Sequence, residues 1–86
     1  MSRQIAIVVT ALPATGTQGP RFKAVCNLAS HTRALRPALE GKANALLCAQ
    51  EMCTELEHIQ GAVWRVCTEV LDNPSKPGSW VLVAKC

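Results

Sequence analysis

Residues 37–59 read P-A-L-E-G-K-A-N-A-L-L-C-A-Q-E-M-C-T-E-L-E-H-I and contain the one clear helical period of the chain. Small or mostly apolar side chains recur at steps of three or four, which is the spacing of one helical face: Leu39, Ala43, Leu46, Leu47, Gln50, Cys53 and Leu56. Polar residues fall mainly on the other side: Glu40, Lys42, Asn44, Glu51, Glu55 and His58. The pattern predicts one amphipathic helix whose first face packs on the rest of the chain.

The ends of this helix carry recognisable signals. Pro37 suits a first turn, where its missing N–H has no partner within the helix in any case. Gly41 costs about 1 kcal/mol relative to Ala in a helix interior, so we expect regular helix from near Lys42. Gly61 is the expected stop.

The helix is flanked on both sides by strand-like runs. We predict strands over residues 3–12, 21–28, 62–71 and 80–85, a loop over 13–20, a polar connection over 29–36 and a turn over 72–78. Residues 3–12 superficially resemble a signal peptide, but the run is short, strongly β-branched and broken at Pro13, which favours a strand. The predicted fold is α+β, a four-stranded antiparallel sheet with one helix on one face, in the order ββαββ.

Length and composition narrow the class of protein. The 86 residues are 49% apolar, which predicts a single folded domain over residues 1–86. No apolar run approaches the roughly 18 residues needed to cross a membrane, so no membrane partner is expected. The five cysteines form no C-x-x-C pair, and their positions favour reduced core thiols in a cytoplasmic protein over a disulfide scaffold.

No catalytic, cofactor or metal site is predicted. Cys48 and Cys53 are five residues apart, as are Cys53 and His58, and a step of five turns a helix by about 140°, so the three cannot converge on one ion. A Cys–His nucleophilic pair using His31 or His58 lacks any local feature that would depress a thiol pKa. Phosphate-binding glycine motifs are missing, and the glutamates fit a solvated surface, so an enzyme is not expected.

The basic residues form the candidate binding site. They are spread over the second predicted strand, the entrance to the helix and the third predicted strand: Arg21, Lys23, Arg33, Arg36, Lys42 and Arg65. Such side chains attract phosphates without regard to sequence, and Trp64 and Trp80 would stack on bases if they shared one open surface. A core position is the ordinary alternative for both tryptophans. A small basic nucleic-acid-binding module therefore remains one candidate function.

A resemblance to a known family rests on the last third of the chain. Gln60-Gly61-Ala62-Val63-Trp64-Arg65-Val66, followed by a turn and Gly78-Ser79-Trp80, is similar to the strand entrance and final Gly-x-Trp of small phage anti-CRISPR proteins that act on type I systems. The turn is longer than in that group, and five cysteines are unusual for it.

The resemblance implies a non-enzymatic inhibitor in the cytoplasm of a bacterial host. It would dock on a Cas protein of the surveillance complex and block target DNA, with Arg65, Arg21 and Lys23 as the foremost contacts. A third candidate is a structural or assembly subunit that forms a homodimer through residues 3–12, because both faces of that predicted strand are largely apolar.

Overall fold

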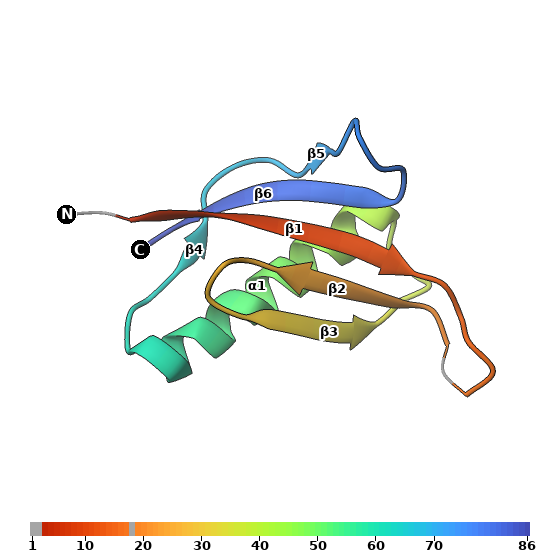
Figure 1. Cartoon of the computed structure of the whole chain (residues 1–86), viewed down its shortest axis with the longest axis horizontal. Coiled ribbons are helices and arrows are strands. Elements are labelled where there is room, and N and C mark those ends of the chain that lie inside the picture. Colours follow the sequence, from red (N-terminus) through yellow and green to blue (C-terminus); the bar gives the residue numbers. More distant parts are fainter. Residues whose placement is uncertain (1–2, 18) are drawn as a thin grey trace.

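The protein folds as an antiparallel sheet with a single long helix across one face (Figure 1). This computed structural model describes residues 3–17 and 19–86. In chain order the elements are β1 (Gln4–Leu12), β2 (Arg21–Val25), β3 (Ser30–Ala34), α1 (Gly41–Gln60), β4 (Arg65–Val66), β5 (Leu71–Asp72) and β6 (Ser79–Lys85). The strands lie in the order β3-β2-β1-β6-β4, and β5 pairs with β6 next to β4. The predicted α+β class with a helix on one sheet face is confirmed.

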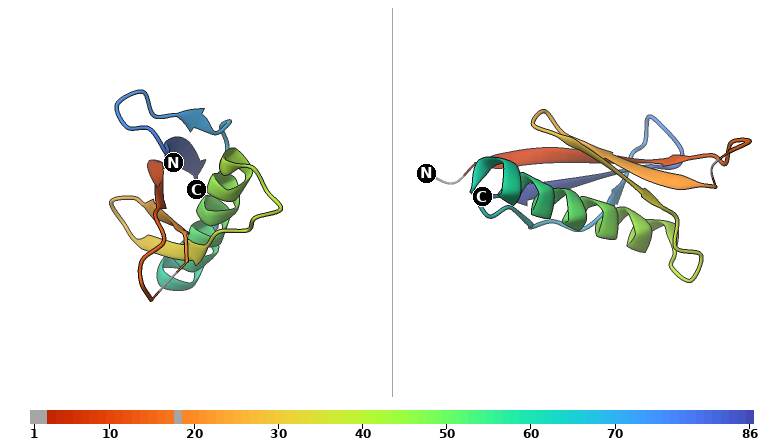
Figure 2. Two further views of the ribbon diagram at one scale, coloured as in Figure 1. Left: turned by 90° about the vertical axis from the view of Figure 1, so that its right-hand side faces the viewer. Right: turned by 90° about the horizontal axis from the view of Figure 1, so that it is seen from below.

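The first and last strands hold the centre of the sheet. β1 pairs with β6 over seven residue pairs, from Gln4 opposite Lys85 to Thr10 opposite Ser79. Three pairs along this ladder present apolar side chains to the helix: Ile5 with Ala84, Ile7 with Leu82 and Val9 with Trp80. Ile7 and Val9 are fully buried. The core therefore lies between this ladder and α1, and the sheet curls around the helix (Figure 2).

The buried face of α1 differs from the predicted one. Cys53 and Leu56 are buried as expected, but Gln50 and Leu39 are exposed and Ala43, Leu46 and Leu47 are only half-buried. The residues that face the sheet are mostly small or flexible: Asn44, Ala45, Cys48, Ala49, Met52, Cys53 and Leu56. The predicted face was wrong because it was assigned from the spacing of the leucines, on the assumption that the largest apolar side chains face the sheet. Small side chains let the helix axis come close to the sheet, and Leu46 and Leu47 are only half-buried beside this face, whereas Leu56 is buried within it.

Asn44, predicted to face water, is completely buried and organises the entrance to α1. Its Oδ1 accepts a hydrogen bond from the Arg36 backbone N–H at 2.9 Å. Its Nδ2 donates to the backbone carbonyls of Arg36, Leu39 and Glu40 at 3.1, 3.1 and 3.0 Å. One side chain thus closes the loop before the helix, where the Glu40 side chain makes no capping bond.

The glycines at the two ends of α1 have different roles. Gly61 ends the helix as predicted, with φ of 71° and its N–H donating to the Glu57 carbonyl at 2.8 Å. Gly41 begins the helix one residue before the predicted start. A Cβ there would lie 2.9 Å from Cζ2 of Trp80, so the indole packs directly on the helix backbone.

The predicted four strands and ββαββ order were wrong in two places. Residues 29–36 are not a simple connection, because Ser30–Ala34 form strand β3. Its inward side chains are His31 and Arg33, which bind Glu51 of α1, so the strand has no apolar alternation to reveal it.

The second error concerns residues 62–71, which were predicted as one strand. They contain only the two-residue strand β4 and the first residue of β5. Between them, the Thr68 hydroxyl accepts a hydrogen bond from the Val83 N–H, a bond that a regular ladder would give to a backbone carbonyl. The pairing with β6 is therefore interrupted at this point. No helix in the described part of the chain is both long and apolar enough to cross a membrane.

Candidate protein-interaction surface

Within residues 3–17 and 19–86, no other helix or strand covers the face of the sheet turned away from α1 (Figure 2). Antiparallel register places Val25, Val8, Val81 and Leu71 side by side across β2, β1, β6 and β5. We call these four residues the apolar row. Val25 and Leu71 are 43% and 59% exposed, and Val8 and Val81 are half-buried. Ala6 and Val83 form a second apolar pair beside the row. The uncovered face therefore has an apolar centre.

Basic residues border this centre at both ends. Lys23 lies opposite Thr10 and Arg21 opposite Leu12, one and two steps beyond the row on the same face. At the other end Lys85 pairs with Gln4 and is itself registered with Arg65 of β4. Thr10 and Gln4 are six residues apart on β1, so the two basic ends are separated by roughly 20 Å.

The charges of the chain are strongly segregated. Residues 1–39 contain five Arg and Lys and no Asp or Glu, and all six acidic residues fall between Glu40 and Asp72. Strands β1, β2, β3 and β6 consequently carry no carboxylate side chain. The uncovered face formed mainly by these strands is positively charged around its apolar centre.

The six predicted contact residues do not form one site. Arg21, Lys23 and Arg65 belong to strands that build the uncovered sheet, as described above. Arg33 instead faces the helix, and its Nη1 donates to Oε2 of Glu51. Arg36 and Lys42 are exposed at the entrance to α1. The structure brings Arg21 and Lys23 together, places Arg65 at the far end of the face and leaves the other three elsewhere.

Both tryptophans lie on the helix side of the sheet. Trp80 stacks at 5.5 Å from Phe22 with an interplanar angle of 30°. Trp64 is only 4% exposed, and the Arg3 guanidinium sits 5.5 Å above its ring. The core position, the alternative considered for these residues, is therefore correct. The uncovered face offers no aromatic ring on which a base could stack.

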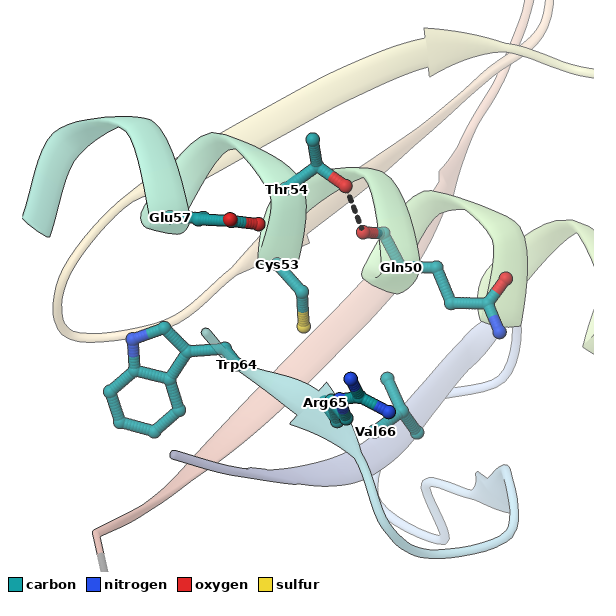
Figure 3. Close-up of a pocket in the computed structure, with 7 residues that line it drawn as sticks. All are labelled: Gln50, Cys53, Thr54, Glu57, Trp64, Arg65 and Val66. Atoms are coloured by element: carbon teal, nitrogen blue, oxygen red, sulfur yellow. Dashed lines mark hydrogen bonds between the residues drawn. The ribbon is translucent and has the colours of Figure 1, made fainter. Parts of the chain in front are cut away.

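A hollow of about 230 Å³ opens between the C-terminal half of α1 and β4 (Figure 3). Its lining is mixed: Gln50, Cys53, Thr54, Glu57, Trp64, Arg65 and Val66. Arg65, which its register with Lys85 assigns to the uncovered face, therefore also borders this hollow. The Thr54 hydroxyl donates to the Gln50 carbonyl at 3.3 Å and is thereby tied to its own helix.

The cysteines are distributed between core and surface. Cys48 and Cys53 are buried, Cys26 is half-buried, and Cys67 and Cys86 are exposed. Burial raises the pKa of Cys48 to about 11 and also raises the pKa of Cys53. Both thiols are thus protonated and poor nucleophiles near neutral pH. Among residues 3–17 and 19–86 no group of three or more His, Cys, Asp and Glu side chains could hold a metal ion.

The apolar row was missed, although the sequence held part of its signal. Residues 3–12 are apolar on both faces, and Val25 is the one apolar residue on the outer face of the second strand. The contribution of β6 and β5 could not be read in the same way, because it depends on register between strands distant in the chain.

Comparisons of the chain with models of protein families, with curated proteins and with solved structures gave no match.

Proposed function

We propose that this chain is a non-enzymatic binding protein that docks on another protein through the uncovered face of its sheet. The observation that carries the proposal is the apolar row, exposed on that face and bordered by basic side chains. Protein interfaces commonly combine an apolar centre with a polar rim that remains in contact with water. Covering a valine-sized side chain completely contributes about 1.5–3 kcal/mol, so a few such residues supply a useful central contact.

The basic residues that border the apolar row indicate which kind of partner surface would fit this face. Arg21 and Lys23 at one end and Arg65 and Lys85 at the other favour a surface that carries carboxylates about 20 Å apart, with apolar side chains between them. A second copy presenting the same face would bring positive rims together, which opposes self-association there. The absence of stacking aromatics on this face favours a protein over a single-stranded nucleic acid.

The family resemblance makes this proposal more specific. A small anti-CRISPR protein would use the face to dock on a Cas subunit of a type I surveillance complex and prevent target DNA from pairing with the guide. Arg21, Lys23 and Arg65 would then contact acidic groups of that subunit, and the apolar row would lie at the centre of the contact.

The test is a pull-down of the tagged chain from bacterial lysate that contains a type I complex, with and without nuclease treatment. We expect Cas subunits to remain bound after nuclease treatment. The triple variant Arg21→Glu, Lys23→Glu and Arg65→Glu should lose at least 100-fold in affinity while its circular dichroism is unchanged. The matched control is Arg36→Glu with Lys42→Glu and Lys76→Glu, the same change of charge at exposed residues outside the face.

Each other outcome contradicts a defined part of the proposal. Unchanged affinity of the triple variant would exclude the face as the docking site. Loss of all partners after nuclease treatment would indicate a nucleic-acid-binding module. Retention of no partner, together with a concentration-dependent dimer, would favour an assembly subunit.

A further inference from the structure

Strand β3 forms a free edge of the sheet. The hydrogen bonds on either side of it show which of its residues point their backbone N–H and C=O groups outward. The Cys26 N–H donates to the Ala29 carbonyl at 3.0 Å, and the Leu35 N–H donates to the Pro20 carbonyl at 3.0 Å. In an antiparallel ladder, bonded pairs alternate with pairs whose N–H and C=O groups point outward. The residues of β3 whose backbone groups point away from β2 are therefore Ser30, Thr32 and Ala34.

The outward backbone groups of β3 have few hydrogen-bond partners among the described residues. Of the outward groups, the Ala34 carbonyl accepts a bond from its neighbour, Nε of Arg33, at 3.3 Å. No neighbouring strand, proline or lysine blocks the five residues of β3, although these are the usual means by which proteins protect an edge. Figure 1 shows the outer side of β3 at the border of the sheet, away from β1. Such an edge is a template for an added strand.

A hollow lies on each side of this edge. On the uncovered face a hollow of about 310 Å³ is lined by Gly19, Pro20, Arg21, Thr32, Arg33 and Ala34. On the helix face a hollow of about 430 Å³ is lined by His31, Glu51, Thr54, Glu55 and His58. Because successive side chains of a strand point to opposite faces, a strand added to β3 would send its side chains alternately toward the two hollows.

The two hollows differ in charge. The first carries Arg21, whose Nε is buried and has no hydrogen-bond partner in the described part of the chain. An acidic side chain entering there would lie beside Arg21, which lines the hollow and has no carboxylate partner among the ion pairs of the described residues. In the second, the Glu51 carboxylate is already bound by His31 at 2.9 Å and by Arg33, while the side chain of Glu55 is 55% exposed. A basic or polar side chain suits that position.

We infer that β3 accepts an extended peptide segment of a partner protein by strand addition. The segment places an acidic side chain opposite Thr32 or Ala34 and a basic or polar one opposite His31. Backbone hydrogen bonds to Ser30, Thr32 and Ala34 hold it, and the two hollows select its alternating side chains. This site shares Arg21 with the rim of the uncovered face but contains no residue of the apolar row. Because strand addition depends on the β3 backbone, the inference stands whether or not the uncovered face binds as proposed above.

The probe is a library of random nonapeptides displayed on phage, selected on the immobilised full chain. Enriched peptides are expected to carry an acidic residue next to a basic or polar one within an extended stretch. A synthetic peptide of the enriched sequence is then titrated by fluorescence anisotropy. Two N-methylated forms of this peptide are then compared, each methylated at one of the two alternating sets of backbone amides. Methylation of the amides that face β3 should abolish binding, and methylation of the amides that face away should leave binding nearly unchanged.

Two variants of the protein complete the test. Thr32→Pro removes an outward N–H without removing a bond to β2, and we expect it to weaken peptide binding at least 10-fold relative to Thr32→Ala. Val83→Lys, on the uncovered face, should bind the peptide normally, which separates this site from the docking face. If Thr32→Pro fails to fold, the methylated peptides still decide the question.

Three kinds of result would overturn the inference. One is the absence of enrichment over an uncoated surface. Another is equal binding of the two methylated forms, or equal binding by Thr32→Pro and Thr32→Ala. The third is a dimer in sedimentation that Thr32→Pro dissociates, because the occupant of the edge would then be a second copy of the chain.

Discussion

Asn44 shows how much of the helix entrance depends on one side chain. It is a buried amide in a helix face that is otherwise apolar, and all its bonds go to backbone groups of residues 36–40. A buried polar group is tolerated when its hydrogen-bonding capacity is used, and its loss leaves several partners unpaired at once. Asn44 is therefore the polar residue on which the path of the chain into α1 depends.

Replacement of the Asn44 side chain should lower the free energy of unfolding, and the size of the loss should depend on the replacing residue. Asn44→Ala should lower the free energy of unfolding by about 2–3 kcal/mol, because it strips bonds from one N–H and three carbonyls. Asn44→Asp should be at least as destabilising, since a buried carboxylate would face three carbonyl oxygens. Urea unfolding measures both, and the exposed Asn27→Ala serves as the control, expected within about 0.5 kcal/mol of the parent. A stable Asn44→Asp variant would contradict the role assigned to Nδ2.

The buried thiol of Cys48 couples stability to alkaline pH. Its pKa is raised from 9.0 to about 11 by burial, so the unfolded chain loses this proton at a lower pH than the folded chain. The contribution is fully present below pH 9 and is lost as pH rises toward 11, with a slope of up to about 1.4 kcal/mol per pH unit. Cys48→Ala should make the alkaline decline of unfolding free energy shallower between pH 8 and pH 10.5. Cys67→Ala, at an exposed thiol, is the control variant; equal slopes in Cys48→Ala and Cys67→Ala would disprove the assignment.

The contact between α1 and β6 explains a residue that looks unfavourable in the sequence. Gly costs up to about 1 kcal/mol relative to Ala in a helix, the full amount applying to interior positions, yet at Gly41, the first residue of α1, the Trp80 ring occupies the space a Cβ would need. Helix propensity and packing therefore oppose each other at this position. Packing decides, because an added carbon in a filled site typically costs 1–3 kcal/mol.

A double-mutant cycle separates these two effects. Gly41→Ala alone should destabilise the protein by about 1 kcal/mol, since the steric cost exceeds the gain in helix propensity. In the background of Trp80→Phe, which lacks the outer ring atoms near Gly41, the same change should be neutral or stabilising. Thermal and urea unfolding of the four proteins measure the coupling. Equal effects of Gly41→Ala in both backgrounds would mean that the indole does not constrain the glycine.

The elements differ in how far the sequence predicts them. The helix, its stop at Gly61 and the two long strands at the ends of the chain are predicted well, because local periodicity and turn residues determine them. β3 is not predicted, because its inward residues are polar and are satisfied by Glu51, a partner 18 and 20 residues away. The split between β4 and β5 and the rotation of the buried helix face likewise depend on contacts with β6 and β1, which no local pattern contains.

The candidate site is predictable to the same partial extent. Arg21 and Lys23 were found because alternation within one strand assigns them to an outer face. The apolar row was not found as a unit, since its four residues come from four strands and meet only through register. Arg33 was predicted as a partner contact, and no local pattern indicates the ion pair that ties it to Glu51 of the helix, the same contact that hid β3.

The whole molecule is an electrical dipole as well as a two-layer fold. Four of the six acidic residues lie at or within α1, and the strands around the uncovered face supply most of the basic ones. Such a separation orients an approaching partner before contact and accelerates encounter at low salt. The uncovered face belongs to the basic side, so a partner with an acidic surface would meet it in the correct orientation.

The pairing of β1 with β6 also determines how the molecule would respond to force. Gln4 lies opposite Lys85, and the Cys86 N–H donates to the Arg3 carbonyl, so the two outer ends of this central ladder are adjacent. Tension applied at these ends acts on one hydrogen-bonded pair at a time, so the bonds between β1 and β6 break one after another. A ladder loaded in shear would have to break its bonds together. A motor that pulled on either end against the other would therefore open the sheet at its centre with little mechanical resistance.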